Sequence, residues 1–248
     1  MAGPRAGLQF HLPGTWRNPM NEQEARSSKE LHSGDYVLKY EHKPVSRISR
    51  LVPAMALAPD TRLVDYACGN AMLLGEVHDR ILHYTGVDFS EDFIASARSR
   101  AARLGAKNCE FHCEDIVAFC SRHPGSFDVA TALDFTEHVS DAELLPILAA
   151  IRESLKPGGR FYLHTPNLDF FMERMRDAGF ILRQRPEHIA VRGLEGNVAL
   201  LEQAGFARGR IRAMLLPHYN VLRIVHPLRH LPLVGRHFEA RIFIECQR

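Results

Sequence analysis

Residues 63–71 read Leu-Val-Asp-Tyr-Ala-Cys-Gly-Asn-Ala, and this stretch is the strongest indication of the fold that we expect for the chain. Residues 63–67 are typical of a buried β-strand, and a helical pattern follows over residues 72–82. The turn between them consists of small residues, which would let a ligand approach the backbone closely. The stretch therefore predicts one strand–turn–helix unit of an α/β sheet, with a ligand position at the carboxyl end of the strand.

The alternation of strands and helices continues along the chain from this stretch. Further strands are expected over residues 84–88, 109–113, 127–133 and 160–165, and two closing strands over residues 211–216 and 240–246. Helices are expected over residues 34–55, with an interruption at Pro44, and over residues 92–104, 142–155 and 194–204. Because the connections are short, we predict a doubly wound, mostly parallel sheet with helices on both faces.

The length and composition are those of a globular domain. The chain has 248 residues, of which 46% are hydrophobic and 24% are charged, and these values exclude intrinsic disorder and a disulfide scaffold. We expect a flexible N-terminal segment over residues 1–33 and a single domain over residues 34–248. Within that domain, residues 168–237 are expected to form a cap or insertion.

The sequence indicates a cytoplasmic protein with reduced thiols. No stretch approaches the roughly 18 consecutive apolar residues of a membrane span, and residues 1–20 contain no apolar secretory signal. The five cysteines are an odd number scattered along the chain, and Cys109 and Cys113 have no second pair at zinc-site spacing. We therefore expect neither disulfides nor a cysteine metal cluster.

Carboxylates stand at three successive strand ends. Asp65 lies in the first strand, Asp88 ends the second strand, and Asp115 follows the third. Asp88 would accept hydrogen bonds from both hydroxyls of a ribose, and Asp115 would accept one from an exocyclic amine such as that of adenine. A single aspartate of this kind is more often a helix cap or a turn residue, so the prediction depends on the order and spacing of all three.

Together these motifs resemble those of the class I S-adenosylmethionine-dependent methyltransferases, over about residues 34–210. The similar stretches are Asp65-Tyr-Ala-Cys-Gly-Asn-Ala, Thr85-Gly-Val-Asp-Phe-Ser, Phe111-His-Cys-Glu-Asp, Phe127-Asp-Val with Glu137-His-Val, and Leu155-Lys-Pro-Gly-Gly-Arg-Phe. The last is distinctive, because Pro-Gly-Gly between a helix and a strand is habitual in this family. The resemblance implies a Rossmann-like sheet of seven strands, the last of them antiparallel.

The resemblance also implies a position for S-adenosylmethionine across the strand ends. Asp65 would orient the turn or the cofactor's ammonium, Asp88 would hold the ribose, and Phe89 would flank the adenine, whose edge Asp115 and Ile116 would contact. The residues expected to bind the cofactor are Asp65, Ala67, Cys68, Gly69, Asp88, Phe89, Asp115, Ile116 and Leu133.

Two departures from the family pattern concern the first turn. Ala67 and Ala71 stand where the family usually has glycine, and alanine is strained at positive φ, so weakened cofactor affinity is expected. A dinucleotide motif of the form G-x-G-x-x-G is absent, which argues against a nicotinamide cofactor.

The end of the fourth strand, Leu133-Asp-Phe-Thr-Glu-His, offers acid–base or metal chemistry. It resembles the E-x-x-E-H metal cluster of ubiquinone-pathway O-methyltransferases, which implies Asp134, Glu137 and His138 as ligands of Mg²⁺ or another divalent cation. Such a cation would acidify a phenol or catechol hydroxyl. His138 could instead act as the catalytic general base. In a third interpretation His138 packs locally and Asp134 faces water.

Other polar residues are expected around the acceptor pocket. His164, Asn167 and His188 would border it, although a lone histidine in such a place is more often structural. Tyr36, Lys39 and Tyr40 would form a lid over the cofactor or, equally well, belong to a helix packed on the sheet.

Residues 208–236 carry six arginines and three histidines but no aspartate or glutamate, whereas the whole chain has a net charge of +2. Apolar residues are interleaved with these basic ones, so the segment predicts peripheral contact with anionic lipid or a lipid-like substrate. An anionic partner such as RNA, and a solvated face without a partner, are the alternatives.

We therefore expect a methyltransferase that acts on a small-molecule or lipid-linked acceptor, at oxygen if the resemblance at residues 134–138 holds. An RNA or protein methyltransferase that uses the basic segment is a second hypothesis, and base N-methylation is disfavoured because no Asn-Pro-Pro-Tyr-like motif follows the fourth strand. A non-catalytic partner-binding subunit is the third.

Overall fold

The computed structural model describes residues 46–179 and 188–248. The N-terminal segment and most of the helix expected over residues 34–55 lie outside the described residues. Of that helix, the described part is α3 (Ser46–Ser49), followed by the short 3₁₀ turn η1 (Val52–Ala54). Within the described ranges, no helix is both long enough and apolar enough to cross a membrane.

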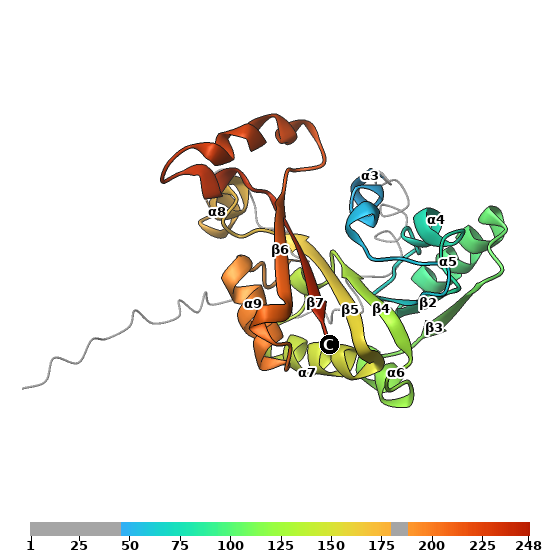
Figure 1. Ribbon diagram of the computed structural model, residues 1–248. Coiled ribbons are helices and arrows are strands. Elements are labelled where there is room, and N and C mark those ends of the chain that lie inside the picture. Colours follow the sequence, from blue (N-terminus) through green and yellow to red (C-terminus); the bar gives the residue numbers. More distant parts are fainter. Residues whose placement is uncertain (1–45, 180–187) are drawn as a thin grey trace, which may run out of the picture.

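One seven-stranded sheet organises the molecule, with the strand order β3-β2-β1-β4-β5-β7-β6 (Figure 1). The strands β1 to β5 pair in parallel, and β7 runs antiparallel to both of its neighbours. Their bounds are β1 Arg62–Tyr66, β2 His83–Asp88, β3 Cys109–Cys113, β4 Phe127–Leu133, β5 Leu155–Pro166, β6 Ile211–Leu216 and β7 Arg241–Gln247. The predicted doubly wound, mostly parallel sheet with an antiparallel last strand is confirmed.

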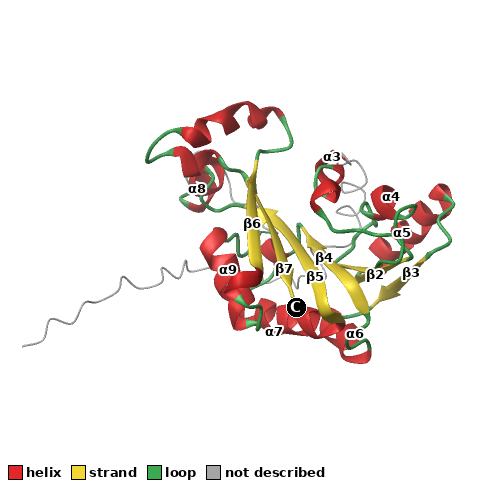
Figure 2. Cartoon of the chain, viewed as in Figure 1, coloured by secondary structure: helices red, strands yellow, loops and turns green. Residues whose placement is uncertain are grey.

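Helices cover both faces of this sheet (Figure 2). Strand β1 shows why, because Val64 and Tyr66 enter one core while Leu63 enters the other, as the two-residue period of a strand requires. The first core is completed by α6 (Ile116–Arg122), α7 (Asp141–Ser154) and α9 (Leu194–Gln203). The second is completed by α3, η1, α4 (Leu74–Val77) and α5 (Glu91–Leu104).

The position of the site follows from the strand order. From β1 the chain moves outward through β2 to β3, and it then returns to place β4 on the other side of β1. The connections that follow β1 and β4 therefore run in opposite directions along the sheet. This leaves a crevice at the carboxyl ends of the central strands.

Two helices were not expected from the sequence, namely α6 and α8 (Phe171–Asp177). Both have only seven residues, too few to display a clear helical period. The range predicted as a cap, residues 168–237, is also divided, because α9 and β6 belong to the main layers. The remaining described parts are α8 and the 3₁₀ segments η3 (Arg208–Arg210), η4 (Val221–His230) and η5 (Gly235–Phe238).

Candidate functional site

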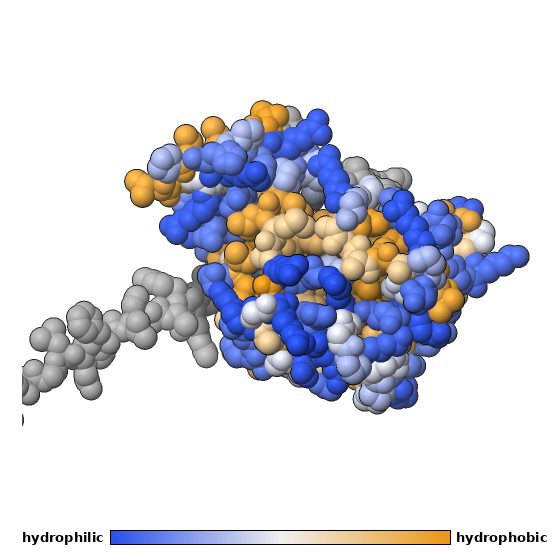
Figure 3. All heavy atoms as spheres, viewed as in Figure 1, coloured by the Kyte–Doolittle hydropathy of each residue, from blue (hydrophilic) through white to orange (hydrophobic). Residues whose placement is uncertain are grey.

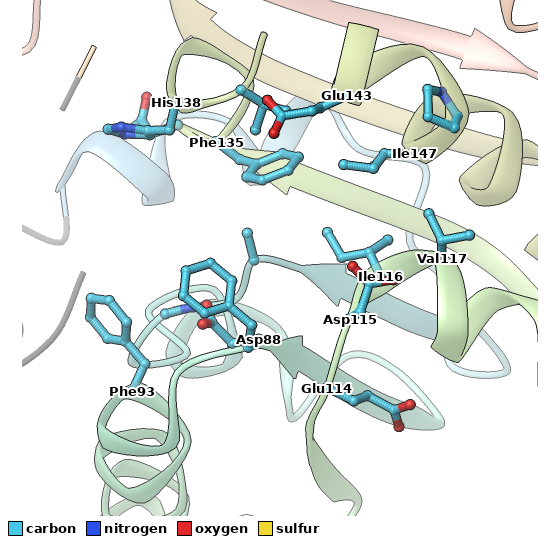
Figure 4. Close-up of a pocket in the computed structure, with 16 residues that line it drawn as sticks. Asp88, Phe93, Glu114, Asp115, Ile116, Val117, Phe135, His138, Glu143 and Ile147 are labelled. Atoms are coloured by element: carbon cyan, nitrogen blue, oxygen red, sulfur yellow. The ribbon is translucent and has the colours of Figure 1, made fainter. Parts of the chain in front are cut away.

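A cavity of about 410 Å³ lies at the carboxyl ends of β1, β2, β3 and β4. Figure 4 shows its two walls, with Asp88, Asp115 and Ile116 on one and Phe135, Glu143 and Ile147 on the other. His138 and Val117 lie toward opposite ends of the cavity. Residues predicted to bind the cofactor that line the cavity are Ala67, Gly69, Asp88, Phe89, Asp115 and Ile116.

The turn after β1 has the geometry of a glycine-rich loop, although it holds only one glycine. Ala67, Gly69 and Ala71 have φ values of 51°, 53° and 54°, so two alanines occupy the left-handed region. The Cys68 N–H donates to the Val87 carbonyl at 3.1 Å and ties the turn to the end of β2. The strain expected at Ala67 and Ala71 is thus present, because at positive φ the Cβ atom of alanine lies too close to the backbone, whereas glycine has no Cβ.

Asp88 joins this turn to the start of α5. One carboxylate oxygen accepts the Gly69 N–H at 3.0 Å, and the other accepts the Ser90 N–H at 2.9 Å. Because each carboxylate oxygen has about two acceptor positions, both can also accept a ribose hydroxyl. The Asp88 side chain is therefore fixed and lines the cavity, as a ribose-binding carboxylate must.

The end of the cavity near Val117 suits an adenine ring. Ile116, Val117 and Ile147 provide apolar walls there, and Phe89 also lines the cavity. Asp115 lines it as well, while one of its oxygens accepts the Ala118 N–H at 3.0 Å as the N-cap of α6. The cap interpretation and the binding interpretation of Asp115 are thus compatible, because the second oxygen is left for an amine.

Asp65, Cys68 and Leu133 are not among the residues that line the cavity. Asp65 is buried beneath the turn, where it accepts the Thr131 hydroxyl at 2.6 Å and the Tyr84 hydroxyl at 2.7 Å. Burial raises the pKa of Asp65 to about 6 against the effect of these two hydrogen bonds. Its position fits the expected role in orienting the turn, and not direct contact with a ligand.

Asp134 lies at the edge of the cavity, but its side chain is only 8% exposed because it is the centre of an ionic cluster. Its carboxylate lies 2.7 Å from Arg47 of α3, 2.9 Å from His164 of β5 and 3.1 Å from Arg241 of β7. Burial opposes ionisation, but His164, Arg47 and Arg241 hold the pKa of Asp134 well below its usual range. With two arginines already bound, this carboxylate is unsuited to the cation-ligand role that the resemblance implies.

A different trio comes together beside the cavity. Glu137, His138 and His188 place potential ligand atoms within 4.8 Å of one another. The rings of His138 and His188 are 5.1 Å apart, and the Thr165 hydroxyl donates to Glu137 at 3.1 Å. Burial, and then the charge of Asp134, raise the pKa of Glu137 to about 7.

The other residues expected around the pocket have mixed positions. His164 and Asn167 are buried and do not line the cavity. The Asn167 amide instead donates to the Glu239 carbonyl at 2.8 Å, which joins the end of β5 to the start of β7. Tyr36, Lys39 and Tyr40 lie outside the described residues.

Sequence reasoning missed the cavity wall that α5 and α7 supply. The additional lining residues include Phe93 of α5 and Glu143, Pro146 and Ile147 of α7. The available signal was the Ser140-x-x-Glu143 pattern, which forms a capping box and fixes where α7 begins. The face of α7 that lines the cavity is set by packing against the rest of the fold, so the sequence of the helix alone does not predict it.

Comparison with known proteins gives relatives along nearly the whole chain. A family model described as "Methyltransferase domain" matches residues 57–205. The ubiquinone biosynthesis O-methyltransferase of Aromatoleum aromaticum is 28% identical over 174 residues, which cover 68% of this chain and 71% of that protein. The protein of the same name from Yersinia pestis (strain Pestoides F) is 28% identical over 240 residues, or 92% of this chain and 94% of that one.

Among solved structures, a SAM-dependent methyltransferase from Archaeoglobus fulgidus matches with a TM-score of 0.67 at 16% identity. The match covers 86% of this chain and 100% of that chain, and it concerns the fold.

Proposed function

Because the chain belongs to the methyltransferase domain family, whose model matches residues 57–205, we propose that it methylates a hydroxyl oxygen of a small or lipid-linked acceptor. The chain is an S-adenosylmethionine-dependent methyltransferase, and the choice of oxygen is the proposal. The names of the relatives, which are O-methyltransferases of ubiquinone biosynthesis, support methyl transfer to oxygen.

The lining of the cavity fits the cofactor. Asp88 would hold the ribose, Phe89, Asp115 and Ile116 would surround the adenine, and the backbone at Ala67 and Gly69 would face the amino-acid part. When bound, S-adenosylmethionine would supply an electrophilic methyl group on a sulfonium, and in-line attack by an aligned acceptor on that methyl carbon would release S-adenosylhomocysteine. Alignment in this cavity is therefore the main contribution that the chain makes to the rate.

The position of His138 in the cavity is the observation that supports methylation at oxygen. It lines the same cavity as Asp88 and lies toward the end opposite Val117, where the acceptor would enter. A hydroxyl must lose its proton as it is methylated, and an imidazole accepts protons near neutral pH. His138 would take that proton, and the neighbouring His188 and Glu137 would orient its ring.

A divalent cation at Glu137, His138 and His188 is a second way to acidify the same hydroxyl. Calorimetric titration with Mg²⁺ and Zn²⁺ distinguishes the two mechanisms. Binding heat that is lost in His188→Ala and kept in His83→Gln, a histidine outside the cavity, would support the cation. Absence of binding, with and without S-adenosylhomocysteine, would leave His138 as the base.

The test of the function is transfer of a labelled methyl group to a catechol and to the matched aromatic diamine. We expect a methyl ether from the catechol and little product from the diamine. His138→Gln should lower kcat by about 10²–10⁴-fold while the affinity for S-adenosylhomocysteine is kept, and His83→Gln should be unaffected. Methylated nitrogen, methylation only of RNA or protein, or an undiminished His138→Gln variant would contradict the proposal.

A further inference from the structure

Residues 217–240, here called the arm, leave the sheet at the end of β6 and return at the start of β7. Figure 1 shows the arm projecting beyond these strands, above α8. Its base is anchored, because Phe170 is 6.2 Å from His218 and Phe171 is 6.0 Å from Phe238, measured between ring centroids. The arm is therefore fixed to the rest of the molecule at its base, and its outer side does not pack on the sheet.

Large apolar side chains are concentrated on the arm. Five of the ten that are exposed among the described residues belong to it. Figure 3 shows hydrophobic side chains along the outer edge of the arm, beside hydrophilic ones. Leu233 is 96% exposed and Ile224 is 71% exposed. The other three are Leu228, Leu231 and Val234. Such a group of protruding aliphatic side chains marks an interaction surface.

The charge of the arm is entirely positive outside its last two residues. Residues 217–238 contain Arg223, Arg229 and Arg236 together with four histidines, and no aspartate or glutamate. None of the ion pairs found among the described residues involves these three arginines. Of the arginines of the basic segment outside the arm, Arg208 pairs with Glu195 and Glu202, whereas Arg210 and Arg212 are in none of these ion pairs. The arm thus carries three of the segment's five arginines that lack an ion pair among the described residues.

The element η4 sorts these side chains into rows. In a 3₁₀ helix residues three apart lie one above the other, so Arg223, His226 and Arg229 form a basic row. A hydrogen bond of 2.6 Å joins Arg229 to the His226 ring within this row. The exposed Ile224 lies beside it, and the turn at Leu233 follows the helix. Basic and aliphatic groups thus emerge from one short element.

We infer that the arm docks on the surface of an anionic lipid bilayer. Exposed leucine, isoleucine and valine enter the boundary between headgroups and acyl chains, and the arginines pair with lipid phosphates at the same level. This commits the surface to a lipid partner, and the inference goes beyond the choice of methyl acceptor.

Two other occupants fit the arm less well. Single-stranded RNA is bound largely by stacking on aromatic side chains, and no aromatic residue is among the large apolar residues exposed in the described ranges. Tyr219, an aromatic residue of the arm, is instead held by Arg241, which donates to its hydroxyl at 3.0 Å. A second copy of the chain offers no charge complement, since the remaining residues are close to neutral in total.

The arm and the cavity lie at the same edge of the sheet. In the strand register Leu216 at the end of β6 pairs with Arg241, and Arg241 pairs with Pro166 at the carboxyl end of β5. Arg241 also contacts Asp134, which lines the cavity, and Tyr219 at the base of the arm. A docked arm would therefore bring the carboxyl edge of the sheet, where the acceptor enters, toward the bilayer.

Flotation of the full chain with lipid vesicles tests this inference. We expect binding to phosphatidylcholine vesicles that contain phosphatidylglycerol, and little binding to phosphatidylcholine alone. The double variant Arg223→Glu/Arg236→Glu should weaken partitioning at least about tenfold, and Ile224→Ser/Leu233→Ser should weaken it by a similar factor.

Control variants change arginine and leucine side chains at exposed positions outside the arm. Arg80→Glu/Arg103→Glu reverses two exposed charges, and Leu82→Ser removes a leucine that is 51% exposed, both away from the arm. These controls should bind vesicles as the unaltered chain does, and all variants should keep their affinity for S-adenosylhomocysteine. Absence of binding to anionic vesicles at low salt, equal loss in arm and control variants, or binding to single-stranded RNA alone would overturn the inference.

Discussion

At the scale of single residues, the first turn of the sheet holds two alanines in a conformation that favours glycine. Ala67 and Ala71 have φ values of 51° and 54°, and the turn is retained because Asp88 and Val87 hold its N–H groups from the next strand. The left-handed conformation costs an alanine roughly 1–2 kcal/mol. The conformation of the turn beside the cavity therefore lowers the stability of this chain.

Replacing Ala67 by glycine should release that strain. We expect Ala67→Gly to raise the free energy of unfolding in urea by about 1 kcal/mol, with unchanged or tighter binding of S-adenosylhomocysteine. The control Ala102→Gly, at an exposed position inside α5, should lower it by about 1 kcal/mol, because glycine is a poor helix former. A destabilised Ala67→Gly variant would contradict the strained turn.

At the scale of elements, one side chain at the end of β4 connects four parts of the fold. Asp134 contacts Arg47 of α3, His164 of β5 and Arg241 of β7, all of them buried. Removing one member of such a group leaves uncompensated charge inside the protein, which usually costs more than the intact group contributes. The cluster thus fixes how α3 and β7 meet the central strands.

Asp134 has a φ of 55°, in the left-handed region that asparagine tolerates as aspartate does. The variant Asp134→Asn therefore keeps the shape of the side chain and the backbone conformation but removes the charge. We expect a loss of about 3 kcal/mol in the free energy of unfolding near neutral pH. The surface variant Glu195→Ala, which breaks an exposed pair with Arg208, should leave the free energy of unfolding nearly unchanged. Equal losses in the two variants would show that the cluster is not an energetic centre.

The same variant has a defined pH dependence. The pKa of Asp134 is depressed in the folded chain, so the unfolded chain takes up this proton first as the pH falls. The stability that the ionised group contributes is therefore complete above its ordinary pKa of about 4 and is lost below it. The difference between the unaltered chain and Asp134→Asn should grow as the pH falls from 7 to 5, because the charge of Asp134 helps to raise the pKa of Glu137 and the variant lacks this effect. It should shrink below about pH 4, where Asp134 takes up its proton in the unfolded chain.

At the scale of the whole molecule, ligand binding and folding are linked through the crevice between the two halves of the sheet. The cavity takes its lining from the connections after four strands and from α7, so a bound ligand contacts residues far apart in the sequence. A ligand that binds only the folded chain stabilises it by an amount set by its concentration relative to Kd.

S-adenosylhomocysteine at about one hundred times its Kd should therefore raise the free energy of unfolding by about 2.7 kcal/mol, and NADH should not. In Asp88→Asn the increase should largely disappear at the same concentration, whereas Glu91→Gln, at an exposed position three residues along, should keep it. Thermal unfolding with each ligand measures these shifts. A full shift in Asp88→Asn would remove Asp88 from the ribose site.

Strands and their order along the chain could be predicted because their signals are local. The third strand at Cys109–Cys113 and the fourth at Phe127–Leu133 begin and end where the sequence indicates. The turn at residues 67–71 and the carboxylate of Asp88 could be predicted as well, since their spacing reflects the backbone geometry of one strand–turn–helix unit. Short helices such as α6 were not predicted, because seven residues form too few turns to show the hydrophobic period of a helix.

Local sequence patterns were sufficient to predict the α/β sheet, the small-residue turn after β1 and the basic, apolar character of the segment before β7. Each of these depends on hydrophobic period, turn chemistry or charge over a short stretch, which neighbouring residues carry among themselves. The contacts of Asp134 with two arginines, and of His188 with Glu137 and His138, were found only in the folded chain. These contacts join residues that are far apart in the sequence, and long-range packing, which no local pattern encodes, sets which of them meet.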